Sequence, residues 1–162
     1  MASILRFDNW QNSDGTSIAT TDASGNISFA GSGAGKILQV VNDYDTSTIT
    51  TTSTSFVATN ASVTITPSAA TSKILLIGSV YAFFSNTVDA DTYLSFDRDG
   101  TTISAETRYT QGVTNYRIST ALVYLDSPSS TSALTYTLEW KTSGGTSTIQ
   151  NAHSITAMEV SA

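Results

Sequence analysis

Residues 134–140, Leu-Thr-Tyr-Thr-Leu-Glu-Trp, alternate between apolar and polar side chains. A β-strand turns successive side chains to opposite faces, so this segment predicts one buried face made of Leu134, Tyr136, Leu138 and Trp140. The chain also contains 28 Thr and 25 Ser, whereas the helix-favouring residues Lys and Glu occur three times each. Thr and aromatic residues suit a pleated, half-buried surface. The sequence therefore predicts an all-β protein.

Further strand-like segments follow one another along the chain, and several are bounded by turn residues. The spacing is typical of an antiparallel β-sandwich or jelly roll of about eight strands. In residues 92–97 the alternation predicts that Leu94 and Phe96 share a face, and Asp99-Gly100 predicts a tight hairpin turn. The Thr- and Ser-rich tract 46–55 fits an edge strand and an extended linker equally well. No internal repeat supports a β-helix, the main alternative. The expected strands are residues 36–42, 62–66, 73–83, 92–97, 101–104, 116–125, 134–140, 146–150 and 154–160.

The 162 residues suffice for one domain and a short appendage. Residues 1–31 predict a hairpin that pairs 17–21 with 27–30, followed by a glycine-rich joint at 32–35 and a β-sandwich head at 36–162. The first segment has too few apolar side chains for a core of its own, and an isolated hairpin is marginally stable in water. We therefore expect it to attach to a partner through its apolar residues, which are Ile4, Phe7, Trp10, Ile18, Ile27 and Phe29.

The charge of the chain excludes several classes of partner. Its net charge is −6 and its isoelectric point is near 4.4, whereas nucleic-acid binding requires clustered cations. The sequence contains no run of eighteen apolar residues, so it predicts no membrane-spanning helix. The first ten residues, MASILRFDNW, contain no apolar stretch long enough for a signal peptide. We therefore expect the chain to be made, and to fold first, in a cytoplasm. Cysteine is absent, so neither disulfides nor thiolate sites are available.

Few residues suggest catalysis or ligand binding. His153 is the single histidine, and a histidine near the end of a β-domain is most often a surface or loop residue. The segment 31–36, Gly-Ser-Gly-Ala-Gly-Lys, resembles a phosphate-binding loop but precedes a strand, so a hinge is the better interpretation. Carboxylates spaced by two residues are typical of turns as well as of cation sites. The sequence thus predicts no catalytic residue, cofactor or metal. The carboxylate pairs are Asp43/Asp45, Asp89/Asp91 and Asp97/Asp99.

Aromatic residues outside the clearest core positions have two interpretations. Aromatic rings can stack on sugars, and they serve equally well in a core or in a contact between subunits. The residues concerned are Trp10, Tyr44, Tyr81, Tyr109 and Tyr116.

Several segments resemble a known family when they are taken together in order. They are GSGAGKILQVVND followed by the Thr/Ser tract, then VTITPSAATSKILLIGSV, YLDSPSSTSALTYTLEWKT and SITAMEV. Over residues 33–162 the chain resembles small virion proteins of tailed phages, common in marine and cyanobacterial phages and often described as tail-fibre or structural proteins. The resemblance implies a non-enzymatic virion component, a homotrimer with a sandwich-type head on an N-terminal attachment segment. It transfers no catalytic residue.

Three functions are compatible with these observations. The first is a virion fibre or knob that is attached to the particle by residues 1–31 and displays its head, with a host-surface glycan as a candidate ligand. The second is a capsid decoration protein that stabilises the head lattice of the virion. The third is a carbohydrate-binding β-sandwich module. In the first two, the partners are further copies of the chain and other virion proteins, and neither nucleic acid nor a membrane is a partner.

Overall fold

The computed structural model describes residues 9–21, 23–25, 27–29 and 35–162. The chain divides into two compact units, Met1–Gly35 and Lys36–Ala162. Every regular element in the described residues is a β-strand, which confirms the expected all-β class. Within these ranges there is accordingly no helix that could cross a membrane.

The first unit contains a small antiparallel sheet with the order β1-β2-β3. Its strands are β1 (Asn9–Gln11), β2 (Ser17–Thr21) and β3 (Ile27–Phe29). The expected hairpin is confirmed, because β2 pairs with β3. Strand β1 was not expected. It is joined to β2 by a turn in which the backbone N–H of Thr16 donates to the side chains of Asn12 (2.8 Å) and Asp14 (2.9 Å).

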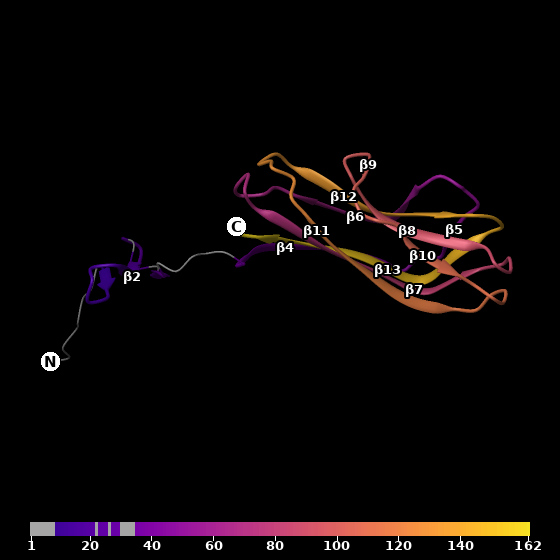
Figure 1. Ribbon diagram of the computed structural model, residues 1–162, viewed down its shortest axis with the longest axis horizontal. Coiled ribbons are helices and arrows are strands. Elements are labelled where there is room, and N and C mark those ends of the chain that lie inside the picture. Colours follow the sequence, from indigo (N-terminus) through magenta and orange to yellow (C-terminus); the bar gives the residue numbers. More distant parts are fainter. Residues whose placement is uncertain (1–8, 22, 26, 30–34) are drawn as a thin grey trace. The chain divides into compact units, whose positions relative to one another are not determined.

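The second unit consists of two five-stranded sheets that pack as a sandwich (Figure 1). In the β13 sheet the order is β11-β7-β13-β4, with β5 also pairing with β13. In the β12 sheet the order is β10-β8-β12-β6, with β9 also pairing with β8. The strands are β4 (Ile37–Asp45), β5 (Ile49–Thr51), β6 (Val57–Ile65), β7 (Lys73–Ser85), β8 (Asp91–Arg98), β9 (Thr101–Thr102), β10 (Thr107–Thr110), β11 (Ile118–Asp126), β12 (Leu134–Thr142) and β13 (Ser147–Val160).

The antiparallel pairs of the head are nested within one another. The innermost pair is β8 with β10, and the pairs β7 with β11, β6 with β12 and β4 with β13 enclose it in turn. The head is thus one long hairpin of four strand pairs, rolled up so that successive pairs fall alternately in the two sheets. Its two ends meet, because the backbone N–H of Ser161 donates to the carbonyl oxygen of Lys36 at 2.9 Å.

The core lies between the two sheets and follows the predicted alternation. Leu94 and Phe96 are both buried, and so are all four apolar residues of the segment 134–140. Ile118, Leu122 and Tyr124 likewise share the inward side of β11. The largest fully buried side chains include Trp140, Tyr136, Phe83 and Phe96.

Gly78 permits a close approach between the two sheets. A methyl group at this position would lie 3.0 Å from the ring of Phe96 and 3.1 Å from Leu122. Both neighbours are buried, so neither can easily move away. The absence of a side chain at Gly78 therefore lets the Phe96 ring pack directly on β7.

Strand boundaries differ from expectation in several places. β6 begins at Val57 instead of residue 62, and β10 was not expected. In the tract 46–55 only Ile49–Thr51 is a strand, at the edge beside β13. Residues 147–160 form one continuous strand instead of two. The head has ten strands, of which the short strands β5 and β9 lie off the main order of the two sheets and the other eight agree with the expected number.

A bulge explains why β13 remains continuous. The register between β13 and β7 shifts between Ile149 and Ala152, where Asn151 has a φ of 76°. On β7, Ala82 has a φ of 48°, and both Ala82 and Phe83 are buried. Such backbone conformations are costly for residues other than glycine, and bulges serve to redirect side chains. Here the bulge resets the alternation of β7, so that Phe83 and Ser85 are buried beyond the outward-facing Tyr81.

Candidate functional site

His153 lies within β13, and only 1% of its surface is exposed. The expectation that it is a surface or loop residue is wrong, because the alternation of β13 turns it inward together with Ile155. Neither ring nitrogen has a hydrogen-bond partner among the described residues. Burial lowers the pKa of His153, and the negative charges of Asp45 and Asp43 oppose this in part. An enclosed imidazole cannot reach a substrate, so it is not available as a general base.

The carboxylate pairs noted in the sequence accept hydrogen bonds from the chain itself. Among the described residues, no group of three or more His, Asp or Glu side chains is arranged to hold a metal ion. Most of these carboxylates thus fasten turns and neighbouring strands. The donors are Ser62 N–H to Asp43 (2.9 Å), Ser47 to Asp45, the hydroxyls of Thr110 and Tyr93 to Asp91, Gly100 N–H to Asp97 (3.0 Å) and Thr135 N–H to Asp99 (2.9 Å).

Glu159 is a buried carboxylate that is saturated with hydrogen bonds. Ser68 donates to Oε1 through its backbone N–H (2.7 Å) and its hydroxyl (2.6 Å), and Gln39 Nε2 donates to Oε2 (2.7 Å). Burial alone would raise the pKa of Glu159, but hydrogen bonds from Ser68, Ser72 and Gln39 outweigh it and lower the pKa to about 2. The carboxylate joins β13, β4 and the loop between β6 and β7, so its role is structural.

Asp126 also has a structural role, because it joins strands of the two sheets inside the sandwich. Its Oδ2 accepts a hydrogen bond from the Tyr136 hydroxyl (2.7 Å) and forms an ion pair with Arg98 (2.6 Å). Burial, together with the hydrogen bond to Asp126, raises the pKa of the Tyr136 hydroxyl. This cluster connects β11 of one sheet to β12 and β8 of the other.

Glu139 is buried, yet its Oε1 atom has no hydrogen-bond partner among the described residues. Burial raises the pKa of this carboxyl, and a hydrogen bond from Thr102 offsets the effect in part. Glu139 and Asp97 both line a hollow of about 270 Å³, which could hold a small hydrogen-bond donor or a cation. Sequence analysis did not single out Glu139, because it occupies an outward position of β12 and resembles an ordinary solvent-exposed residue.

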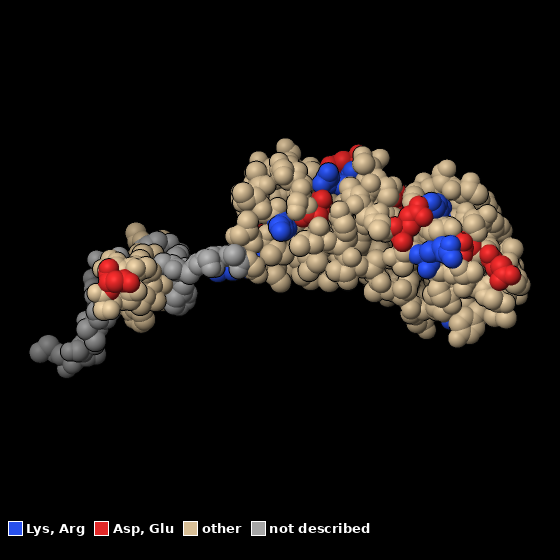
Figure 2. All heavy atoms as spheres, viewed as in Figure 1, with Lys and Arg blue, Asp and Glu red and all other residues tan. Residues whose placement is uncertain are grey.

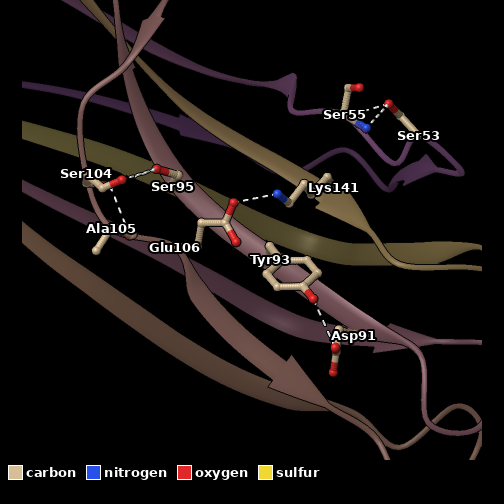
Figure 3. A network of polar contacts seen from close by, with 9 residues as sticks. All are labelled: Ser53, Ser55, Asp91, Tyr93, Ser95, Ser104, Ala105, Glu106 and Lys141. Atoms are coloured by element: carbon tan, nitrogen blue, oxygen red, sulfur yellow. Dashed lines mark hydrogen bonds and ion pairs between the residues drawn. The ribbon is translucent and has the colours of Figure 1, made fainter.

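The outer side of the β12 sheet is polar and charged. Lys141 pairs with Glu106, and the Tyr93 hydroxyl donates to Asp91 at 3.0 Å (Figure 3). The Lys141 ammonium also lies 4.4 Å from the centre of the Phe56 ring and 4.8 Å from that of Tyr93. In the view of Figure 2, the charged side chains of the head gather in separate clusters with uncharged surface between them.

The outer side of the β13 sheet is different. In its four main strands, all within the described residues, Lys73 is the single charged side chain at an outward position. Strand register aligns apolar residues across the whole sheet in the row Leu125–Leu75–Met158–Val40. Val123 pairs with Ile77 beside this row, and Val160 pairs with Ile37 at the end of the sheet. We call this surface the apolar patch. Its members are Ile37, Leu38, Val40, Leu75, Ile77, Val123, Leu125, Met158 and Val160.

A groove flanked by two tyrosines lies beyond the apolar patch on the same side. Tyr44 and Tyr81 are 62% and 56% exposed, and both line two adjoining hollows of about 390 and 680 Å³. Ser79 lines both hollows, and its hydroxyl is hydrogen-bonded to that of Ser154 on the neighbouring strand at 2.8 Å. Among the described residues that line these hollows, none is Asp, Glu, Lys or Arg. This tyrosine groove therefore offers two aromatic faces above an uncharged polar floor. Sequence analysis named both tyrosines but could not bring them together, because β13 lies between their strands.

The remaining aromatic candidates take other positions. Tyr109 packs against the core, with its ring centre 6.0 Å from that of Phe83. Tyr116 is exposed and does not line the tyrosine groove.

Three of the six expected attachment residues are exposed side chains in the first unit. These are Trp10 on β1, Ile18 on β2 and Ile27 on β3. Phe29 ends β3, whereas Ile4 and Phe7 lie outside the described residues. Residues 32–34 of the glycine-rich joint also lie outside them.

No protein-family model matches the sequence, and no curated protein matches it either. Among solved structures, the fold resembles VP2 of infectious bursal disease virus, seen in the crystal structure of a subviral particle. The TM-score is 0.50 at 18% sequence identity, and the alignment covers 76% of this chain and 32% of VP2. The chain thus spans about a third of the VP2 chain, and at this identity the likeness is one of fold alone.

More distant matches include the Gt strain of the same virus, with a TM-score of 0.44, 15% identity and coverage of 85% of this chain and 40% of the other. PorU of Porphyromonas gingivalis has a TM-score of 0.39 at 11% identity, and the match covers 80% of this chain and 14% of PorU. These similarities are too low to carry an argument.

Proposed function

We propose that this chain is a non-enzymatic structural protein of a virus particle, with a jelly-roll head at residues 36–162. The observation that carries the proposal is the nested pairing of its strands. The principal strands β4, β6, β7, β8, β10, β11, β12 and β13 can be numbered one to eight. They then lie in the orders 6-3-8-1 and 5-4-7-2, the arrangement of a double Greek key. Jelly rolls of this kind are common in viral capsid and lectin domains.

Two further observations support a virion role. VP2, which has a similar fold, is found in a subviral particle, so a sandwich of this kind is compatible with assembly from many copies. The sequence resemblance to small virion proteins of tailed phages points in the same direction and favours a homotrimeric fibre or knob. A capsid decoration protein remains the alternative within this class.

Residues 1–31 are proposed to attach the head to the particle, through Ile4, Phe7, Trp10, Ile18, Ile27 and Phe29. Among residues 10–21, 23–25 and 27, for which the structure describes burial, Ala19 is the one buried apolar side chain, whereas Trp10, Ile18 and Ile27 are exposed. Three short strands that leave these apolar side chains exposed are marginally stable by themselves. Docking on another virion protein would cover the exposed side chains and stabilise the small sheet.

Deletion of residues 1–31 tests the attachment. Particles of the parent virus would be assembled with either the full chain or residues 32–162, and the bound protein would be measured and located by electron microscopy. We expect the shortened chain to stay folded and to be absent from the particles. The triple variant W10S/I18S/I27S should reproduce the loss without shortening the chain. Normal incorporation of the shortened chain would contradict the proposed role of this segment.

A second candidate function is carbohydrate binding, and the tyrosine groove is the observation that favours it. Tyr44 and Tyr81 present exposed aromatic faces, on which the apolar faces of sugar rings can stack. The hydroxyl-bearing residues Ser79, Ser119 and Thr120, which line the groove, can hydrogen-bond to sugar hydroxyls. In the fibre hypothesis this groove would recognise a neutral glycan on the host surface.

A glycan array followed by calorimetry tests this function. Binding of a neutral glycan should weaken at least tenfold in Y44A and in Y81A, because each loses one stacking face. Y116A is the matched control, since Tyr116 is equally exposed but does not line the groove. Equal weakening in Y116A, or no binding of any neutral glycan by the unaltered chain, would contradict this function.

A further inference from the structure

We infer that the apolar patch is the surface through which copies of this chain associate, with the tyrosine groove left uncovered. The inference rests on the proposed assembly of the chain with itself and names the surface that would carry it. The patch lies on one side of the β13 sheet and extends across β11, β7, β13 and β4.

The size of the patch suits a contact between proteins. Val123, Ile37 and Val40 are each more than half exposed, at 65%, 58% and 54%. Together, the nine side chains expose on the order of 600 Å² of apolar surface. This area is at the upper end of the range found for the largest apolar patch on a monomeric protein. A stable interface covers about 800 Å² on each partner, of which a little over half is apolar. The patch could therefore supply the apolar part of such an interface without any other segment of the head.

The charge distribution favours a second copy as the occupant. Each copy carries a net charge of −6, so association requires a surface on which like charges do not meet. The outer side of the β12 sheet displays the charged residues Asp91, Glu106 and Lys141. On the outer side of the β13 sheet, within its four main strands, which the structure describes in full, Lys73 is the one charged side chain, and it lies at the border of the patch. An anionic membrane would require several cations at the same place, and the patch does not provide them.

The position of the patch also fits a shared point of attachment. Ile37 and Leu38 belong to the patch and follow Gly35, the last residue of the first unit, by two and three residues. Copies that are joined with their heads side by side would hold these residues close together. Their N-terminal segments would then start from one place, as attachment at a single site on a particle requires. The tyrosine groove occupies the other half of the same side.

Charge substitution within the patch tests the inference. The full-length chain, V123E, the double variant V123E/L125E and the control V113E would be compared by sedimentation velocity at micromolar concentration. Val113 is 58% exposed but lies outside the patch, between β10 and β11. We expect the unaltered chain and V113E to be oligomers and V123E/L125E to be a monomer. The dissociation constant for self-association should be at least a hundredfold higher in V123E/L125E than in the unaltered chain. V123T, which keeps a β-branched side chain, should weaken association less, and circular dichroism would verify folding.

Two outcomes would overturn the inference. An oligomer that persists unchanged in folded V123E/L125E would place the contact elsewhere, and a monomeric unaltered chain would mean that some other partner covers the patch. Incorporation into particles, measured separately for the same variants, reports on the virion role. A chain that fails to associate through the patch but still enters particles would refute this inference and leave the proposed function intact.

Discussion

Replacement of Glu159 by Gln probes the hydrogen bonds that close one end of the sandwich. The carboxylate accepts hydrogen bonds from Ser68 and Gln39, and the side-chain amide introduced by E159Q would direct an NH₂ group at one of these donors. The folded chain loses the charge of Glu159 at a pH of about 2, whereas an unfolded chain loses it near 4.5. The unfolded state therefore binds the proton first as the pH falls. This group stabilises the fold fully above pH 4.5, and its contribution is lost as the pH falls to about 2.

The size of the effect follows from the pKa difference. A change from 4.5 to about 2 corresponds to roughly 3 kcal/mol in the free energy of unfolding. Water near the end of the sandwich screens part of this, so we expect E159Q to be less stable by roughly 2 kcal/mol at pH 7. The difference between E159Q and the unaltered chain should shrink as the pH falls below 4.5 and become small near pH 2, where Glu159 of the folded chain is about half protonated.

Urea denaturation at pH 7, 4.5, 3 and 2 measures these free energies, with the fluorescence of the buried Trp140 as the signal of unfolding. The matched control is E106Q, because Glu106 is largely exposed and its pair with Lys141 lies on the surface, where ion pairs contribute little. A deficit in E159Q that is the same at pH 2 and pH 7 would refute the assignment of a depressed pKa. An equal loss in E106Q would show that the effect is not specific to the buried carboxylate.

Two other features lead to separate expectations. G78A should lower the free energy of unfolding by about 1–3 kcal/mol, because the added methyl group would press on Phe96. The control G112A should leave stability unchanged, because the space around Gly112 is open. Equal stabilities of the two variants would contradict the close packing at Gly78. The ring signals of His153 in NMR spectra should titrate with a midpoint below 6.5, and the fold should lose stability as the pH falls through this range, since the unfolded chain binds the proton first. A midpoint at or above 6.5 would mean that the ring is accessible to water.

The strands that the sequence predicts well are those whose two faces differ in polarity. Leu94 and Phe96 alternate with polar residues, because β8 faces the core on one side and solvent on the other. β10 was missed because Tyr109 is its one apolar residue and packs at the edge of the core. The polar pair Gln150-Asn151 resembles a turn, but it forms a bulge instead, and the pairing of β13 with β7 resumes at Ala152.

The candidate site was less accessible to sequence analysis. Val40 and Val123 lie outside the core, but an apolar residue on a strand has the same pattern whether it is buried in its own domain or left for a partner. The tyrosine groove depends on the order β7-β13-β4, which brings residues 81 and 44 to one surface. The burial of His153 likewise depends on which face β13 turns toward the β12 sheet. These features arise from tertiary arrangement, which local patterns do not encode.

The nested pairing also determines when the head can close during translation. β4 leaves the ribosome early, but its partner β13 is synthesised roughly a hundred residues later, a delay on the order of ten seconds at typical elongation rates. During that interval the innermost hairpin, β8 with β10, can already form, while the apolar residues of β4 remain unpaired. A nascent chain of this design is therefore most vulnerable to aggregation just before its last strand emerges, and slowing elongation there should lower the yield of folded protein.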